Sequence, residues 1–168
     1  MNNITNLLGP HSNNWAFTGS VAMAIHGNRL GVKTRTPQNI NIAVNPNKMM
    51  NFYLTLRGNK WLPTGPPSGD RIHLTKNGKN LDILAAGKLA PKLIHRRKYK
   101  GHPPVMSIEA LLKRQINMNN SNKRNRNINT LKKLKKKPGS NNNTNNFNSP
   151  VRTPKRTNNN NNASYRTP

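Results

Sequence analysis

The sequence contains no cysteine and only three acidic residues among 168, and each scarcity excludes a class of protein. Without cysteine there is no disulfide framework, no thiolate nucleophile and no cysteine-based zinc site. No apolar run reaches the roughly 18 residues that a membrane-spanning helix needs, so we expect no membrane partner. The N-terminus lacks the basic and apolar regions of a secretory signal. We therefore expect an intracellular protein, in the nucleus or in the interior of a virion.

The scarcity of acids leaves 29 lysines and arginines unbalanced, and the formal net charge is +26. A domain with this charge repels itself and needs counter-ions or an anionic partner. Strong basicity is the electrostatic footprint of nucleic-acid-binding domains. We expect nucleic acid as the partner, DNA rather than RNA, held mainly by its phosphates. A solvated basic surface on a protein with another role is the alternative.

The basic residues are concentrated in the second half of the chain, where 18 of them follow residue 95. Phosphate contacts are independent of base sequence, and the low aromatic content of 5% argues against a platform for stacking unpaired bases. The lysine run at 132–137 also fits a nuclear-localisation signal. The residues expected to contact nucleic acid are Arg96, Arg97, Lys98, Lys100, Lys123, Arg124, Arg126, Lys132, Lys133, Lys135, Lys136 and Lys137.

The composition divides the chain into three parts. Residues 1–105 read as a small α/β domain, and 106–137 as a basic helical extension. From residue 138 to 168 the chain is rich in asparagine and broken by proline. A segment with so few apolar residues cannot bury enough surface to offset its ordering entropy. We therefore expect a disordered tail.

Hydrophobic periodicity predicts an α/β (α+β) fold, with a small mixed sheet, flanking helices and then basic helices. Asn-Gly at 77–78, between two alternating runs, is typical of a β-hairpin turn. Ser107 is a fitting cap for the helix that follows it. The histidines show no metal-binding spacing, and we expect them in loops or facing solvent. The expected strands are 15–18, 39–44, 71–75 and 80–84, and the expected helices are 21–25, 46–56, 108–116 and 126–137.

One set of motifs resembles a known family. Thr18-Gly19-Ser20, a helix, and then Asn39-Ile40-Asn41-Ile42 are similar to the nucleotidyltransferase superfamily, the polymerase-beta-like fold. That family shows a strand, Gly-Ser, a helix, a strand with two carboxylates, and a later strand with a third carboxylate, which Asp82 matches. The resemblance implies phosphate binding at Gly19, Ser20 and Arg35. An unrelated small α/β domain is the alternative.

The chain departs from the family at the residues that carry its chemistry. Asn39 and Asn41 stand where the family has metal-binding carboxylates, so only Asp82 remains charged. Asparagine keeps the size of aspartate but not its charge, and Mg²⁺ binds mainly through carboxylates and substrate phosphates. We therefore expect no catalytic residue, no metal, no cofactor and no enzymatic activity.

The preferred hypothesis is a catalytically inactive nucleotidyltransferase-like domain that binds nucleic acid, with a polycationic tail. The asparagine-rich composition suits genome packaging or coating in a large DNA virus. Two alternatives stay open. One is an active nucleotidyltransferase with non-standard metal ligands, and the other is a structural particle or scaffold protein with a basic tail.

Overall fold

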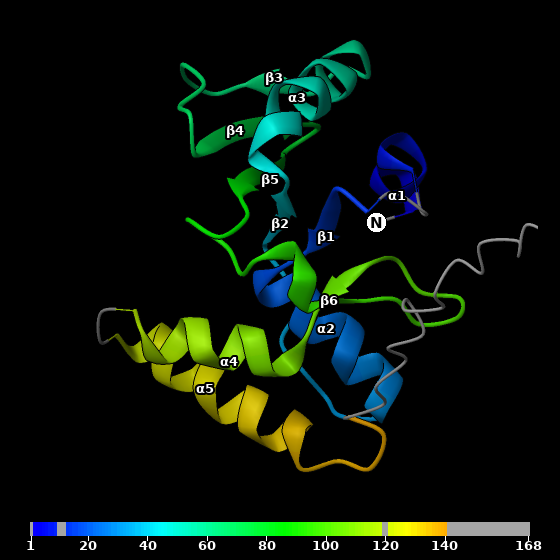
Figure 1. Cartoon of the computed structure of the whole chain (residues 1–168), viewed down its shortest axis with the longest axis vertical. Coiled ribbons are helices and arrows are strands. Elements are labelled where there is room, and N and C mark those ends of the chain that lie inside the picture. The colour runs from blue at the N-terminus through cyan, green and yellow to red at the C-terminus, as the bar shows by residue number, and fades with distance from the viewer. Residues whose placement is uncertain (1, 10–12, 119–120, 141–168) are drawn as a thin grey trace, which may run out of the picture.

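The computed structural model describes residues 2–9, 13–118 and 121–140, which form a mixed sheet of seven strands with helices around it (Figure 1). The helices are α1 (Asn2–Leu8), α2 (Gly19–Leu30), α3 (Met49–Gly58), α4 (Ile108–Ile116) and α5 (Asn122–Lys135). The strands are β1 (Trp15–Phe17), β2 (Asn39–Val44), β3 (Leu62–Pro63), β4 (Arg71–Lys76), β5 (Lys79–Ala85), β6 (Arg96–Arg97) and β7 (Val105–Met106). Two short 3-10 turns lie at Pro46–Lys48 and Leu93–His95. The expected mixed sheet with flanking helices is confirmed.

The strand order is β3-β4-β5-β2-β1-β7-β6. β2 and β5 run parallel, as do β1 and β7, whereas the other neighbours are antiparallel. Asn41 of β2 lies opposite Asp82 of β5, and Asp82 lies opposite His73 of β4. The register therefore places these three polar residues in one row across the centre of the sheet.

The hairpin β4–β5 forms around the Asn-Gly pair as the sequence predicts. Asn77 and Gly78 both have positive φ angles, 49° and 69°, as a two-residue type I′ turn requires. The turn fixes Lys76 opposite Lys79 and, by counting back along both strands, the whole hairpin register. A local sequence signal thus sets which side chains meet in the middle of the sheet.

The helices are bounded by local hydrogen bonds. The Ser107 hydroxyl accepts a hydrogen bond from the Ala110 N–H at 3.2 Å, which confirms the expected cap of α4. The Ser121 hydroxyl does the same for the Arg124 N–H at 3.2 Å, so α5 begins four residues earlier than the expected 126. Such caps satisfy N–H groups that have no partner inside the helix.

The hydrophobic core joins the sheet to the C-terminal helix. Trp15 and Phe17 pack edge to face with ring centroids 5.1 Å apart, and Ile83 of β5 belongs to the same cluster. Leu131 and Leu134 of α5 are 1% and 0% exposed within it. The segment 106–137, expected to be a basic extension, therefore shares its core with the α/β domain, while the expected domain boundaries stay a prediction.

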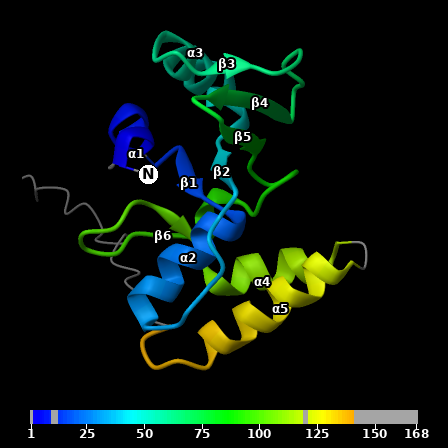
Figure 2. The same ribbon diagram turned by 180° about the vertical axis from the view of Figure 1, so that it is seen from behind.

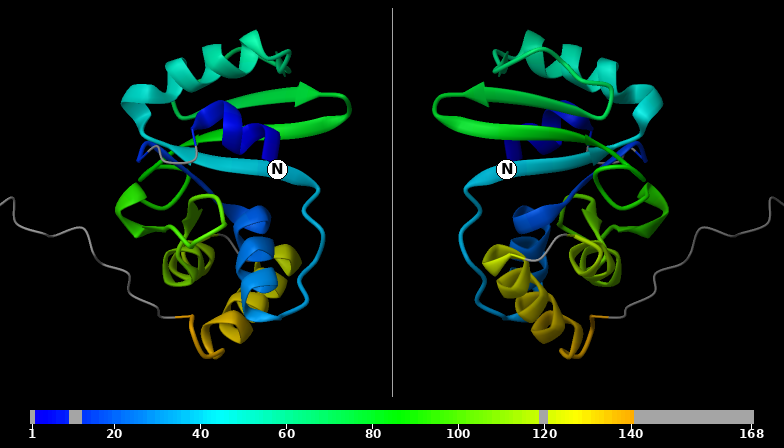
Figure 3. Two further views of the ribbon diagram at one scale, coloured as in Figure 1. Left: turned by 90° about the vertical axis from the view of Figure 1, so that its right-hand side faces the viewer. Right: turned by 90° about the vertical axis from the view of Figure 1, so that its left-hand side faces the viewer.

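The views agree on how the elements are arranged. α3 lies with β3 and β4 at one end of the molecule, whereas α4 and α5 lie side by side at the other end, next to α2 (Figures 1 and 2). The long strands β2, β4 and β5 run across the molecule, between α3 on one side and α2 and α5 on the other (Figure 3). None of the helices in the described part of the chain is long and apolar enough to cross a membrane.

The described chain ends in a turn after α5. Arg29 Nη1 donates to the Gly139 carbonyl oxygen at 3.0 Å, and the Ser140 hydroxyl donates to the Lys135 carbonyl oxygen at 2.8 Å. Two of the first three residues of the expected tail at 138–168, Gly139 and Ser140, are therefore hydrogen-bonded to the folded part. The remainder of the expected tail, 141–168, lies outside the described residues.

Leu134→Ala should lower the free energy of unfolding by about 2–5 kcal/mol, because it removes a fully buried side chain from the shared core. Leu54→Ala is the matched control, since Leu54 of α3 is 57% exposed and surface changes usually stay within about 0.5 kcal/mol. Urea denaturation measures both. Equal losses would contradict the packing of α5 against the sheet.

Candidate active site

The centre of the sheet carries a polar row on one face. Side chains two residues apart along a strand share a face, so Asn39 lies on the face of Asn41, and Arg71 on that of His73. The register brings Asn41, Asp82 and His73 side by side, while Asn39 lies two residues further along, opposite Asn80. The structure therefore brings together Asn41 and Asp82, two of the three positions that the resemblance matched.

The start of α2 docks against this row at Gly19. The Thr18 N–H donates to the Asn41 carbonyl oxygen at 2.9 Å. A Cβ atom at Gly19 would lie only 2.9 Å from the terminal amide atom of Asn41, and the φ of Gly19 is +60°. Both the backbone angle and the close approach require glycine here. The Gly-Ser motif therefore places the first turn of α2 directly beside Asn41.

Asp82 is held by three side chains. Arg71 Nη2 donates to Asp82 Oδ2 at 3.1 Å, and His73 Nδ1 donates to Oδ1. With its amide oriented so that donors meet acceptors, Asn41 donates to Oδ2 at 3.2 Å and to the Ile40 carbonyl oxygen at 3.1 Å. The Asp82 side chain is 9% exposed, whereas those of Arg71 and His73 are 46% and 49% exposed. The carboxylate is thus buried beneath basic groups that face solvent.

This donor set does not fit a pair of divalent metal ions. Two-metal sites hold their ions about 3.5–4 Å apart, and Mg²⁺ is bound by carboxylates together with substrate phosphates. Asn39 and Asn41 are neutral amides, and both oxygens of Asp82 already accept hydrogen bonds from the protein. Among the described residues there is no group of three or more His, Cys, Asp or Glu that could hold a metal.

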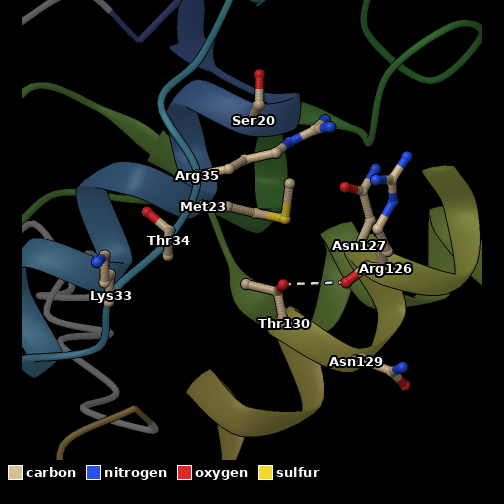
Figure 4. Close-up of a pocket in the computed structure, with 9 residues that line it drawn as sticks. All are labelled: Ser20, Met23, Lys33, Thr34, Arg35, Arg126, Asn127, Asn129 and Thr130. Atoms are coloured by element: carbon tan, nitrogen blue, oxygen red, sulfur yellow. Dashed lines mark hydrogen bonds between the residues drawn. The ribbon is translucent and has the colours of Figure 1, made fainter.

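A basic pocket of about 270 Å³ opens beside Ser20. Its walls come from α2, from the loop that joins α2 to β2, and from α5 (Figure 4). It is lined by Ser20, Met23, Lys33, Thr34, Arg35, Arg126, Asn127, Asn129 and Thr130. Three of these residues are cationic and none is acidic. In Figure 4, Arg35 reaches across the pocket from the loop and Arg126 rises from α5. The pocket is therefore suited to an anion.

The pocket brings together residues that the sequence placed in different groups. Ser20 and Arg35 were expected to bind phosphate, and Arg126 to bind nucleic acid.

Arg124 lies close in space to the end of α4. Its Nε donates to the Gln115 carbonyl oxygen at 2.8 Å, and its Nη2 donates to the Ile116 carbonyl oxygen at 2.9 Å. The structure therefore gives Arg124 a role in joining α4 to α5.

The other expected contacts come from two regions of the fold, α5 and the strand β6 with the loop after it. Lys132, Lys133 and Lys135 are exposed on α5, and Lys136 and Lys137 follow its end, while Lys123 is exposed near its start. Arg96 and Arg97 form β6 at the far edge of the sheet, where Arg96 Nη2 donates to Asn13 Oδ1 at 2.7 Å. Beside them Lys100 is exposed, and burial, followed by the charge of Arg96, lowers the pKa of Lys98. That these residues contact nucleic acid stays a prediction.

The expectation that every histidine lies in a loop or faces solvent is wrong for His26. This residue lies inside α2, is 0% exposed, and its Nε2 donates to the Met106 carbonyl oxygen at 2.7 Å. Burial lowers the pKa of its imidazole below the usual value. The neighbouring Tyr99 ring, 5.8 Å away, is covered by the Arg29 guanidinium at 4.1 Å. His26 therefore anchors α2 to β7.

Comparisons with solved structures identify the fold. The lincosamide antibiotic adenylyltransferase LnuA, with lincomycin bound, superposes with a TM-score of 0.54 at 15% identity, over 71% of this chain and 86% of that one. ANT(2″)-Ia, in complex with adenylyl-2″-tobramycin, gives 0.52 at 12% identity, over 80% and 94%. A Thermotoga maritima protein assigned to the nucleotidyltransferases gives 0.52 at 16% identity, over 79% and 88%. No protein-family model and no curated protein matches the sequence.

These neighbours show that the chain has a nucleotidyltransferase-like fold, as the Gly-Ser and Asn-x-Asn motifs suggested. They also overturn the expectation that it has no enzymatic activity. That expectation came from the loss of two carboxylates at Asn39 and Asn41, whereas the solved neighbours with this fold are nucleotidyltransferases. The amides of Asn39 and Asn41 remove negative charge from the site, but this change alone does not show that the protein lacks enzymatic activity.

Gly19→Ala should cost more stability than Gly31→Ala. Both glycines have left-handed φ angles, +60° and +64°, so both variants lose about 1–2 kcal/mol from backbone strain. Only Gly19 has a close neighbour, since nothing lies within 4 Å of a Cβ at Gly31. Crowding against Asn41 should add about 1–3 kcal/mol. Urea denaturation compares the two, and equal losses would show that Gly19 does not touch the polar row.

Proposed function

We propose that the protein binds a nucleoside triphosphate through its phosphates and transfers the nucleotidyl group to an acceptor hydroxyl, releasing pyrophosphate. The observation that carries this proposal is the pocket at Ser20, where Lys33, Arg35 and Arg126 converge without an acidic residue. The adenylyltransferase among the solved neighbours, and the adenylylated tobramycin bound to another, support the class of reaction.

The size and charge of the pocket suit the triphosphate. Sites for whole small molecules usually span about 300–1,000 Å³, and this pocket of about 270 Å³ is slightly smaller. It has room for phosphates, and the base can lie outside it. Arginine binds phosphate oxygens through a planar fork of donors, and the first turn of α2 adds N–H groups with a favourable dipole. A bound triphosphate would therefore contact donors from α2, from the loop between α2 and β2, and from α5.

The same groups suit the reaction itself. Nucleotidyl transfer breaks the bond between the α- and β-phosphates while a hydroxyl oxygen attacks the α-phosphorus. Phosphoryl-transfer enzymes act mainly by positioning the reactants and by stabilising the charge spread over phosphoryl oxygens. Ser20, Arg35 and Arg126 offer donors for these oxygens around one pocket.

Arg35→Gln and Arg126→Gln should each weaken binding of a fluorescent ATP analogue by about tenfold or more, since hydrogen bonds to charged groups contribute about 1.5–3 kcal/mol. Arg57→Gln is the matched control, because Arg57 is exposed on α3 and lies outside the pocket. Fluorescence titration measures affinity, and release of pyrophosphate with candidate acceptors measures turnover. Unchanged affinity in both pocket variants would refute the proposed site.

A second candidate function, nucleic-acid binding, is favoured by the surface of α5. The helix and the residues directly after it carry eight lysines and arginines, and they contain no acid. Several of these lysines are exposed, including Lys132, Lys133 and Lys135. A nucleic acid held here could present a hydroxyl acceptor to the pocket, because Arg126 of the same helix lines that pocket. Coating or packaging of a genome stays a prediction from composition.

If the protein contacts about 6–10 phosphates of duplex DNA, its affinity should fall by roughly 10³–10⁵-fold between 50 and 200 mM salt. Replacing Lys132, Lys133 and Lys135 by Gln should reduce the salt slope by about one per lysine. The control replaces Lys48, Lys60 and Lys79, which are exposed away from α5. A triple α5 variant that behaves like the control would place the DNA elsewhere, and a salt-insensitive affinity would exclude a backbone-dominated mode.

A further inference from the structure

The polar row at Asp82 contains two basic groups that the proposed function has not used. Arg71 and His73 stand on β4, two residues apart and on the face of Asp82. Their side chains are about half exposed, while the side chain of Asp82 between them and the sheet is 9% exposed. A ligand that approaches this row from solvent therefore meets the basic groups before it meets the carboxylate.

We infer that Arg71 and His73 take the place of a metal ion at this polar row, so that nucleotide phosphate is bound there without a divalent cation. This inference rests on the proposed nucleotide binding. A carboxylate that serves a metal must offer a lone pair to it. Here Oδ1 accepts from His73, and Oδ2 accepts from both Arg71 and Asn41. A metal ion would have to displace these donors and would then face two basic groups.

Arg71 retains most of its capacity to bind a phosphate. A guanidinium has five N–H donors, and one contact joins Arg71 to Asp82. Its planar fork matches two oxygens of a phosphate, and charge-assisted hydrogen bonds of this kind are about twice as strong as neutral ones. His73 uses Nδ1 for Asp82, and in the imidazolium form its Nε2–H can donate to a phosphate oxygen as well. The two residues can therefore contact an anion while staying bound to Asp82.

The sheet fixes these groups in place. Ile72 and Leu74 alternate with them along β4 and are 2% and 1% exposed, so this strand cannot turn over without exposing its apolar face. Asp82 orients the guanidinium and the imidazole, and Asn41 links the row to Gly19 at the start of α2. Asp82 is thus a positioning residue, and Arg71 and His73 are the groups that touch phosphate.

The two modes of binding predict opposite effects of one substitution. If Asp82 held a metal, Asp82→Asn would weaken nucleotide binding. If Asp82 only positions basic groups, the same variant removes a negative charge from beside the phosphate. Two unit charges about 4 Å apart interact by about 1 kcal/mol even in water, so affinity should rise about five- to tenfold. The sign of the change therefore separates the two modes.

The experiment titrates the full chain with a fluorescent ATP analogue, once in EDTA and once in excess Mg²⁺. We expect similar affinity in both buffers, tighter binding by Asp82→Asn, and at least tenfold weaker binding by Arg71→Gln with His73→Gln. The matched control combines Arg57→Gln with His102→Gln, at exposed positions outside the row. Circular dichroism establishes that each variant is folded, and a second pair, Arg71→Lys with His73→Asn, replaces any that is not.

The outcomes separate this inference from the proposed function. Binding that requires Mg²⁺, or that Asp82→Asn weakens, overturns metal-independent binding and leaves the nucleotide site intact. Unchanged affinity in the Arg71 and His73 variants also overturns the inference, since the phosphate must then lie only in the pocket at Ser20. Absence of nucleotide binding in both buffers overturns both proposals together.

Discussion

The hydrogen-bonded row around Asp82 is the constraint on which the centre of this molecule depends. A buried carboxylate is stable only when it is paired and hydrogen-bonded, and Asp82 satisfies that requirement through Arg71, His73 and Asn41. These hydrogen bonds join β2, β4 and β5 in a fixed register. Asn41 in turn leaves room only for glycine at the start of α2. The pocket at Ser20 is therefore placed by the same interaction that neutralises the carboxylate.

Much of this arrangement was readable from local patterns in the sequence. Alternating polarity predicted β2, β4 and β5, and Asn-Gly fixed the hairpin register. Counting back from the turn pairs His73 with Asp82, so the sequence already held the signal for both basic neighbours of the carboxylate. Arg71 and His73 were not among the expected site residues, because the family pattern at this site consists of carboxylates. The parallel pairing of β2 with β5 is seen only in the structure, since no local rule pairs strands about 40 residues apart.

Other features could not be predicted, because they depend on packing between distant segments. The pocket needs α5 beside α2, and that contact is made by Leu131 and Leu134 in the core rather than by any motif. The two-residue strands β6 and β7 are too short to show a period. Arg124 looked like a phosphate ligand among other basic residues, yet it binds the carbonyl oxygens at the end of α4. Charge alone does not distinguish a ligand-binding arginine from a structural one.

The distribution of acids shows how the fold tolerates its charge. Asp70 pairs with Lys88 at 2.9 Å, Asp82 with Arg71 and His73, and Glu109 lies in the first turn of α4, where the helix dipole favours it. Each acidic residue thus stabilises a nearby basic group or a helix end, and none neutralises the charge of the lysines on α5. An anion that binds the folded state alone stabilises it in proportion to RT ln(1 + [L]/Kd). Because Arg126 lines the pocket and the lysines continue along the same helix, α5 carries both anion-binding surfaces. The self-repulsion of α5 is therefore relieved by the ligands that we propose.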